Sequence, residues 1–160
     1  MNDFRIPRPE STADSVEAII QPLAAALAKA SAMGESREIL SHMTRGQKLL
    51  LAYFAYWDDV TNGGHAQYFA NYTSDLWPEA LEAMEALRLA EGSILREAVA
   101  LFPGARPASG FAERQEQLEK IDADKLDELD TRFNEGPGSA EQLQRFVEEH
   151  ANEFFLPKKA

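Results

Sequence analysis

The sequence predicts an all-α protein, a single-domain helical bundle of about six to eight helices around a buried central helix at residues 45–60. Two observations support this prediction. Apolar residues recur at intervals of three and four along most of the chain, which is the period of an amphipathic helix. No segment of useful length alternates apolar and polar residues, as a half-buried strand would. With 160 residues, the chain has the length of one domain with a substantial core.

The first part of the chain is expected to hold an arm and two helices. Residues 1–10 contain prolines and are predicted to form a flexible, extended arm. A helix should follow over residues 11–34, and Pro22 within it predicts a kink or a break near Gln21 because proline lacks a backbone N–H. A short second helix is expected over residues 35–43.

The central helix gives the strongest local signal. Thr44 is placed as its N-cap, and nearly every residue from 49 to 57 is apolar, on all faces of the helix, which is typical of a buried helix. A buried strand is the alternative, since aromatic and β-branched residues favour strands. The leucine and alanine content and the lack of alternation favour the helix. Residues 62–64, with two glycines, should end it.

The rest of the chain is expected to be helical, with turns at residues 103–110 and 135–138. The expected helices are residues 65–72, a helix that begins at Pro78, residues 93–102, residues 111–133 with a break and an aspartate cap at 122–124, and a last helix capped by Ser139. The predicted organisation is thus an arm at 1–10, one helical domain at 11–155 and a tail at 156–160.

Composition excludes several classes of function. The net charge of −11 disfavours direct contact with nucleic acid or anionic membranes and favours a basic partner, although many acidic proteins use such charge only for solubility. No cysteine is present, so disulfides and thiolate metal sites are impossible, which fits a reducing cytoplasm. The N-terminus lacks the features of a signal peptide, and the longest apolar run is far shorter than the roughly 20 residues that cross a bilayer.

One polar segment follows the central helix and forms the first candidate site. Its residues are Asp58, Asp59, Asn62, Gly63, Gly64, Gln67 and Asn71. Two carboxylates at a helix C-terminus oppose the helix dipole, so an arginine, the amides of the turn or a ligand should compensate them. Either the side chains bond to their own turn, or they form a small-ligand or enzyme site with the two amides.

His65 lies within this segment but on the opposite face. Helical spacing puts His65, Tyr68, Phe69 and Tyr72 on one stripe, which predicts a packing role. The chain has three histidines, and no two have the spacing of helical metal ligands, so no metal and no cofactor are expected. No nucleophile elbow or phosphate-binding loop is found either, and the sequence gives no catalytic residue.

A second candidate site is an acidic surface on the later helices. Its residues are Glu113, Glu116, Glu119, Asp124, Asp127, Glu128, Glu141, Glu148 and Glu149. Along a helix of 1.5 Å rise per residue, the acids beyond residue 110 recur about every 3–4 Å, close to the roughly 3.4 Å between phosphates of one DNA strand. The alternative is a solvated helix face held by salt bridges between residues four apart.

Residues 62–71 read Asn-Gly-Gly-His-Ala-Gln-Tyr-Phe-Ala-Asn and resemble the signature N-G-G-F-x-Q-Y-F-x-N of the family that contains the DNA mimic protein DMP. Four later segments support the resemblance, which covers roughly residues 45–155: residues 79–84, 98–104, 126–133 and 146–150. The family implies a helical domain, often a homodimer, whose best-described member imitates DNA and occupies a DNA-binding regulator. Most relatives have no assigned role. His65 replaces the family's phenylalanine, which supports packing and weakens a catalytic role.

Overall fold

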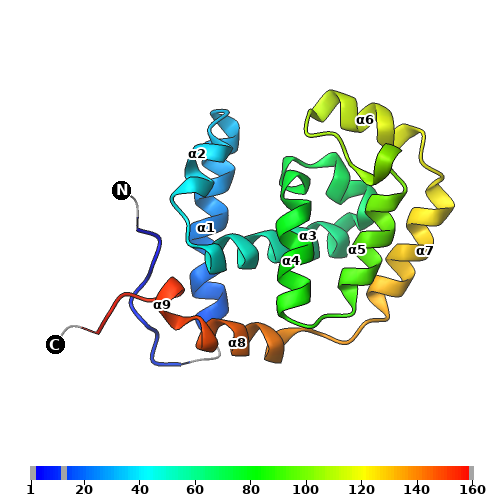
Figure 1. The fold of residues 1–160 in the computed structure, drawn as a ribbon. Helices are drawn as coiled ribbons and strands as arrows, with labels where there is room; N and C mark the ends of the chain where they lie inside the picture. The colour runs from blue at the N-terminus through cyan, green and yellow to red at the C-terminus, as the bar shows by residue number, and fades with distance from the viewer. Residues whose placement is uncertain (1–2, 12–13, 159–160) are drawn as a thin grey trace. The chain divides into compact units, whose positions relative to one another are not determined.

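The computed structural model describes residues 3–11 and 14–158, and these residues are mainly helical (Figure 1). In chain order they form α1–α3, the 3-10 helix η1, α4 and α5, the 3-10 helix η2, and α6–α9. The β-structure in these ranges is an isolated parallel bridge between Ile6 and Phe155. The predicted all-α class is therefore confirmed. Thr12 and Ala13, at the predicted start of the first helix, and Lys159 of the predicted tail lie outside the described residues.

The chain divides into two compact units. Unit 1 comprises Met1–Leu51 and Ser139–Ala160, and unit 2 comprises Ala52–Gly138. The boundary between them falls within the long helix α3, Arg45–Ala70. The single helical domain expected over residues 11–155 stays a prediction.

Unit 1 contains α1 (Ser15–Ala32), α2 (Ser36–Ser41), α8 (Ala140–Glu149) and α9 (Ala151–Phe154). Helix α1 packs against α2 and α8. The core side chains of these elements include Ile19, Leu23, Leu27, Leu143, Phe146, Val147 and Phe154. The break that Pro22 predicts near Gln21 is absent, because α1 runs through both residues. Pro22 is exposed, so water can reach the carbonyl group that the missing N–H leaves without a helical partner.

The N-terminal arm is extended, as predicted, and contacts the end of the chain. The Ile6 N–H donates to the Phe154 carbonyl at 3.0 Å, and the Leu156 N–H donates to the Ile6 carbonyl at 2.9 Å. Arg8 pairs with Glu148 at 2.7 Å, and its guanidinium lies 5.3 Å from the centre of the Phe155 ring. These contacts attach the arm to α8 and to the segment after α9.

Helix α3 contains the central helix that the sequence predicts, but it is not buried on all faces, since Trp57 is 41% exposed. Thr44 caps it: the Gln47 N–H donates to the Thr44 hydroxyl at 3.2 Å, and the Thr44 N–H donates to the Gln47 side chain at 3.0 Å. This reciprocal pair is a capping box. Side chains along the helix are at most 2% exposed at Leu49, Leu50, Leu51, Ala52, Tyr53, Tyr56 and Val60. The backbone leaves the helical conformation at Gly63 and Gly64, as predicted, and a second helical segment follows from His65.

Unit 2 contains the rest of α3 and six further elements: η1 (Tyr72–Leu76), α4 (Trp77–Ala86), α5 (Glu91–Ala100), η2 (Pro103–Ala105), α6 (Phe111–Glu119) and α7 (Ala123–Asn134). Helix α5 packs against α4 and α7 (Figure 1). The predicted break at residues 122–124 is confirmed. It separates α6 from α7, and the Asp122 carboxylate caps α7 by accepting from the Asp124 N–H at 3.1 Å.

Candidate functional site

The two aspartates at the end of the first α3 segment accept hydrogen bonds from nearby side chains. Asn62 donates to Asp58 at 3.2 Å. Asp59 accepts from the Asn71 amide at 2.7 Å and from the Thr73 hydroxyl at 2.8 Å. Neutral side-chain donors thus supply the compensation that the helix dipole requires. These bonds satisfy Asp59 and the Asn71 amide within the protein, and the small-ligand site stays a prediction.

The remaining residues of this first candidate site lie at the interruption of α3. Gly64 has φ +74° and ψ −177°, a conformation that is essentially restricted to glycine. Gln67 lies against Gly63, where an added Cβ would meet the side-chain oxygen of Gln67 at 2.0 Å. The two glycines therefore allow the chain to turn sharply between two buried helical segments.

An aspartate that sequence reasoning did not assign to this site lies directly against the glycine pair. The Asp130 carboxylate accepts from the backbone N–H of His65 at 2.8 Å. A Cβ on Gly64 would come within 2.2 Å of the other carboxylate oxygen. Asp130 comes from α7, and a carboxylate at the start of a helical segment is favourable because the N–H groups there carry partial positive charge.

His65 links this aspartate to the interior of α3. Its Nδ1 lies 2.5 Å from Asp130 Oδ1, and its Nε2 lies 2.9 Å from the Tyr56 hydroxyl. Burial raises the pKa of Tyr56 well above its ordinary value, so the hydroxyl keeps its proton and donates it to Nε2. The proton of the neutral imidazole is then on Nδ1, which donates to Asp130. We call these three residues the Tyr–His–Asp chain.

Two members of the Tyr–His–Asp chain lie in the core, whereas the Asp130 side chain is 23% exposed. His65 and Tyr56 are both 0% exposed, and the Phe133 ring packs edge-on against both rings, with centroids 5.6 Å from Tyr56 and 6.3 Å from His65. Burial lowers the pKa of His65, and the hydrogen bond that its ring donates to Asp130 acts in the opposite direction. The fully buried ring confirms the predicted packing role of His65. Its hydrogen bonds to Asp130 join α3 to α7.

The aromatic stripe is only partly as predicted. Tyr68 and Phe69 are fully buried, but Tyr72 is 44% exposed and belongs to η1. The second segment of α3 ends at Ala70, and Asn71 has extended backbone with φ −95° and ψ 155°. The helical spacing that would have placed Tyr72 inward therefore does not continue to that residue.

Arg114 is a second residue whose role the sequence did not reveal. Its side chain comes from α6 and is buried. It donates to the Phe69, Asn71 and Ala108 carbonyls at 2.8, 3.1 and 2.6 Å, and to the Asp75 carboxylate at 2.7 Å. Its guanidinium attaches α6 to the segment after α3. It does not lie on the acidic surface, where it would reduce the negative charge.

The nine residues of the predicted acidic surface are all exposed, and they divide between the two units. Unit 2 holds six of them: Glu113, Glu116 and Glu119 on α6, and Asp124, Asp127 and Glu128 on α7. Unit 1 holds the other three, Glu141, Glu148 and Glu149 on α8, of which Glu148 pairs with Arg8. Within the described ranges, no ion pair involves any of the six carboxylates of unit 2.

Two further features are absent from the described part of the chain. It contains no cluster of three or more His, Asp or Glu side chains that could hold a metal ion. Its helices include none with the length and apolar character that a membrane span requires.

The sequence matches one family model. The model is described as DMP19-like protein, and the match covers residues 41–150. That range begins just before α3 and ends just after α8, so it includes the glycine pair, both acidic helices of unit 2 and the whole Tyr–His–Asp chain. Neither the curated proteins nor the solved structures contain a match to this chain.

Proposed function

Because this chain belongs to the DMP19-like protein family, a family of DNA mimic proteins, we propose that it is an acidic interaction module that occupies the DNA-binding surface of a basic protein. One observation carries this proposal. Unit 2 contains 17 Asp and Glu against seven Lys and Arg, a net charge of −10. Unit 1 has a net charge of −1, with ten acidic and nine basic residues. Almost the whole net negative charge of the protein thus belongs to 87 of its residues.

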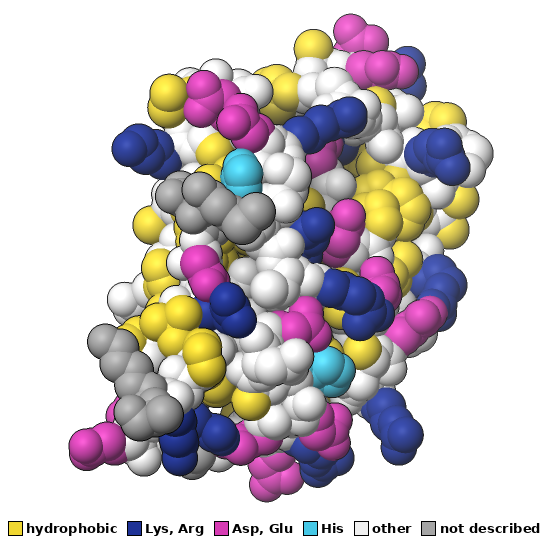
Figure 2. Space-filling model, turned by 60° about the vertical axis from the view of Figure 1, so that its left-hand side comes forward, with side chains coloured by type: hydrophobic (Ala, Val, Ile, Leu, Met, Phe, Trp, Pro, Cys, Tyr) yellow, Lys and Arg dark blue, Asp and Glu magenta, His cyan; other side chains and the backbone are white. Residues whose placement is uncertain are grey.

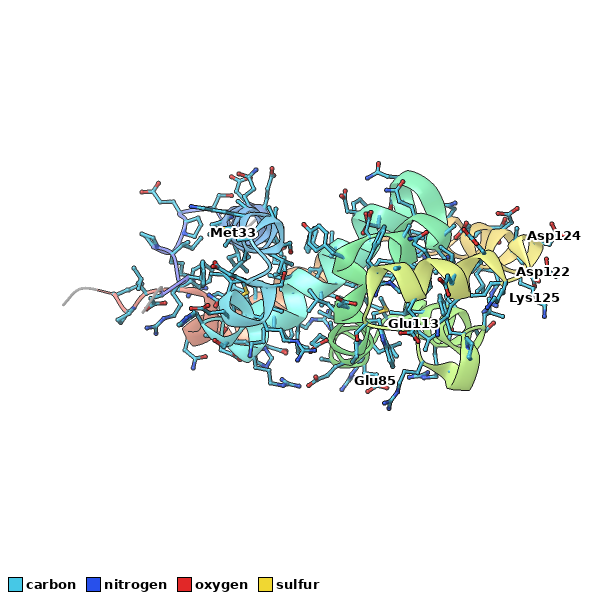
Figure 3. The ribbon with its side chains drawn as sticks, turned by 90° about the horizontal axis from the view of Figure 1, so that it is seen from above. Met33, Glu85, Glu113, Asp122, Asp124 and Lys125 are labelled. Atoms are coloured by element: carbon cyan, nitrogen blue, oxygen red, sulfur yellow. The ribbon has the colours of Figure 1, made fainter. Side chains whose placement is uncertain are left out.

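Three of the seven basic residues of unit 2 pair with acids outside the candidate acidic surface, whereas Arg88, Arg106, Lys120 and Lys125 are exposed. Arg96 pairs with Glu85, Arg132 pairs with Glu97, and Arg114 is buried against Asp75. The six carboxylates of α6 and α7 in the candidate acidic surface are exposed, whereas Asp130 of α7 is partly buried against His65. Figure 3 shows Asp122, Asp124 and Lys125 close together at the start of α7. A concentrated negative field of this kind attracts a basic partner and speeds its association.

The spacing of the acids on α6 resembles that of DNA phosphates. Glu113, Glu116 and Glu119 follow one another at intervals of three residues, on the side of α6 opposite the buried Arg114. Three residues of an α-helix correspond to a rise of about 4.5 Å, against about 3.4 Å between phosphates along one DNA strand. A groove of lysines and arginines that binds DNA would therefore find charges of the same sign at a similar interval.

The charge on the face with α1, α2 and α9 is different. In Figure 2, which brings these helices forward, acidic and basic side chains are interspersed and neither sign forms a continuous patch. This agrees with the small net charge of unit 1. The proposed binding surface is accordingly α6 and α7 of unit 2, and the three acids of α8 belong to unit 1 and form no part of it. The proposal also includes a homodimer, which the family resemblance supports, and a cytoplasmic location, which the absence of cysteine supports.

The test compares two triple variants that change the net charge equally. The first is Glu113→Gln, Glu116→Gln and Glu119→Gln in unit 2, and the control is Glu10→Gln, Glu35→Gln and Glu38→Gln, three exposed acids of unit 1. Binding is measured to a DNA-binding protein that wild type captures from cell extract, with duplex DNA as competitor. We expect the first variant to bind about tenfold more weakly and the control nearly as wild type, because exposed charges contribute modestly and add.

Salt and DNA provide the second readout. Wild-type affinity should fall steeply between about 50 and 200 mM salt. The carboxylates pair with the partner's basic side chains as DNA phosphates would, and salt weakens such pairs. Duplex DNA should displace the protein. A captured partner that binds DNA and this protein at the same time would contradict the proposal, and so would equal weakening by the two triple variants.

A further inference from the structure

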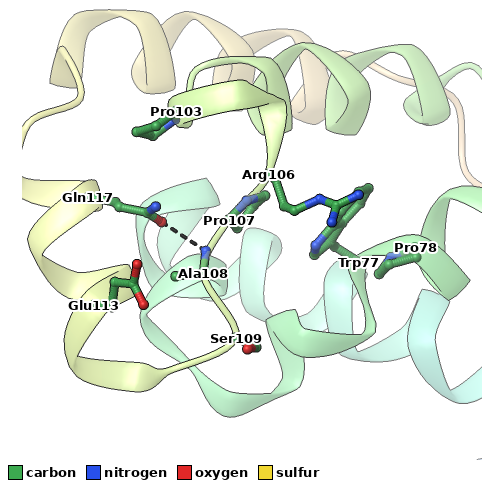
Figure 4. A pocket seen from close by; sticks show the side chains of 9 residues that line it. All are labelled: Trp77, Pro78, Pro103, Arg106, Pro107, Ala108, Ser109, Glu113 and Gln117. Atoms are coloured by element: carbon green, nitrogen blue, oxygen red, sulfur yellow. Dashed lines mark hydrogen bonds between the residues drawn. The ribbon is translucent and has the colours of Figure 1, made fainter.

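Unit 2 contains an open groove of about 690 Å³ beside the start of α6 (Figure 4). Its apolar lining is the Trp77 ring with Pro78, Pro103 and Pro107. Its polar lining includes Arg106 and Glu113. A volume of this size is within the range of sites that hold a side chain or a small molecule. The open form admits a side chain presented by another protein.

The walls of this groove are held in place before anything binds. The Ala108 N–H donates to the Gln117 side chain at 2.8 Å, which Figure 4 shows as a dashed line. The Ala108 carbonyl accepts from the buried Arg114 at 2.6 Å. Proline has a fixed φ angle, so Pro103 and Pro107 reduce the conformational freedom that the loop from 103 to 110 loses on binding. A rigid groove contributes affinity because its ordering is already complete.

The groove is continuous with the acidic row of α6. Glu113 lines the groove and is also the first of the three acids at intervals of three residues. Arg106, on the lining, has an exposed side chain and so repels a cation from the groove itself. A partner segment can therefore bind α6 through its basic side chains. The side chain that it places against Trp77 and the prolines should then be apolar rather than basic.

We infer that this groove takes an aromatic or aliphatic side chain from a basic segment of the same partner that α6 binds. The inference rests on the proposed function and adds a source of specificity to it. Charges along α6 attract any basic protein, whereas the groove selects one that carries an apolar side chain among its basic residues. Buried apolar anchors in preformed pockets provide much of the affinity of protein interfaces.

The test uses two peptides and nuclear magnetic resonance titration of the full-length protein. The first peptide is acetyl-Lys-Lys-Phe-Lys-Lys-amide, and the second has alanine in place of phenylalanine. We expect the phenylalanine peptide to bind about tenfold more tightly, from partial burial of its ring. It should also shift the signals of the Trp77 indole and the Ala108 amide, which the alanine peptide leaves unchanged.

Two variants locate the effect. Ser109 is exposed and lines the groove, so Ser109→Trp fills the groove from its rim. Ala86 is exposed at the other end of α4 from Trp77, so Ala86→Trp serves as the control. In Ser109→Trp the preference for phenylalanine should fall to about onefold while the alanine peptide keeps its affinity, as expected if only the apolar contact is lost. Ala86→Trp should keep the wild-type preference.

Several outcomes would overturn the inference. Equal affinities of the two peptides for wild type would do so, as would an unchanged preference in Ser109→Trp. Equally tight binding of acetyl-Gly-Gly-Phe-Gly-Gly-amide would show that the groove takes a neutral apolar ligand instead. The proposed function is judged separately, from the salt dependence of the alanine peptide. If that peptide binds without salt dependence while the phenylalanine preference persists, the acidic surface fails and the groove remains.

Discussion

At the scale of residues, the glycine pair and the Tyr–His–Asp chain are joined by hydrogen bonds into one structural unit. The interruption at Gly63 and Gly64 exposes the N–H of His65, and Asp130 from α7 accepts from it. The same aspartate accepts from the ring of His65, whose other nitrogen accepts from Tyr56. The polar groups of this segment therefore stabilise the junction between α3 and α7, and the aromatic rings around them are core.

Substitution of Gly64 by alanine should be strongly destabilising. We expect a loss of about 3 kcal/mol in the free energy of unfolding, because the backbone conformation is disfavoured for alanine and the new Cβ would collide with Asp130. The control is Gly104→Ala, at φ +64° with nothing within 4 Å of the added Cβ, for which the loss should be about 1 kcal/mol. Urea denaturation measures both. Equal losses in the two variants would show that the contact with Asp130 is unimportant.

The pH dependence of stability should identify His65. Its pKa is lowered in the folded protein from 6.5, so the unfolded chain binds more protons between the two values. The contribution of His65 to the free energy of unfolding is thus highest above pH 6.5. This contribution falls as the pH drops below 6.5, and it stops falling below the folded-state pKa. His65→Phe removes this contribution and also costs about 1–3 kcal/mol, because Tyr56 and Asp130 lose their partner.

The measurement is urea unfolding of wild type and variant at a series of pH values. The difference between the two curves isolates His65 from the other titrating groups. His42→Phe, at an exposed position, is the control and should keep the wild-type dependence. A His65→Phe curve parallel to that of wild type would contradict the assignment.

At the scale of elements, one buried arginine determines where α6 lies. Arg114 holds the segment after α3, η1 and the loop before α6 through four hydrogen bonds. The acidic row on the opposite side of α6 is presented to solvent because this residue is inside. The loop that forms one wall of the groove is fixed by the same guanidinium through Ala108.

Arg114→Met should lower the free energy of unfolding by about 3 kcal/mol, because one buried and two partly buried carbonyl groups lose their donor. Asp75 adds little to the loss, since its side chain is 47% exposed and can be hydrated. Arg132→Met is the matched control: its pair with Glu97 is exposed on both sides, and water screens it. We expect a far smaller change there, measured by urea denaturation. Similar losses for the two variants would indicate that the contacts of Arg114 add nothing beyond a surface ion pair.

At the scale of the whole molecule, the distribution of charge distinguishes the two units. Unit 2 has a net charge of −10 and unit 1 has a net charge of −1. The overall net charge of −11 does not by itself reveal this division. Mutual repulsion among so many exposed carboxylates opposes folding. Retaining them on unit 2 is consistent with a surface that serves binding, and the paired triple variants test this.

Much of the fold could be predicted because its signals are local. Apolar periodicity, the all-apolar run of α3, the Thr44 cap, the Asp122 cap and the glycine pair depend on residues within a few positions of one another. The same locality explains the errors. Pro22 predicts a break from its own chemistry, but whether water can reach the freed carbonyl depends on which side of α1 faces solvent. Tyr72 follows the helical period, but the helix ends before it.

What only the tertiary structure decided is which distant residues meet. Asp130 lies 65 residues beyond His65 in the chain, and Arg114 lies 45 residues beyond Phe69. In the sequence each reads as one more charge on an acidic helix, since a charged side chain looks the same whether it is exposed or buried. The local pattern therefore determined the helices and the family signature. The folding of α6 and α7 onto the end of α3 decided which charges are structural, which face solvent, and where the groove lies.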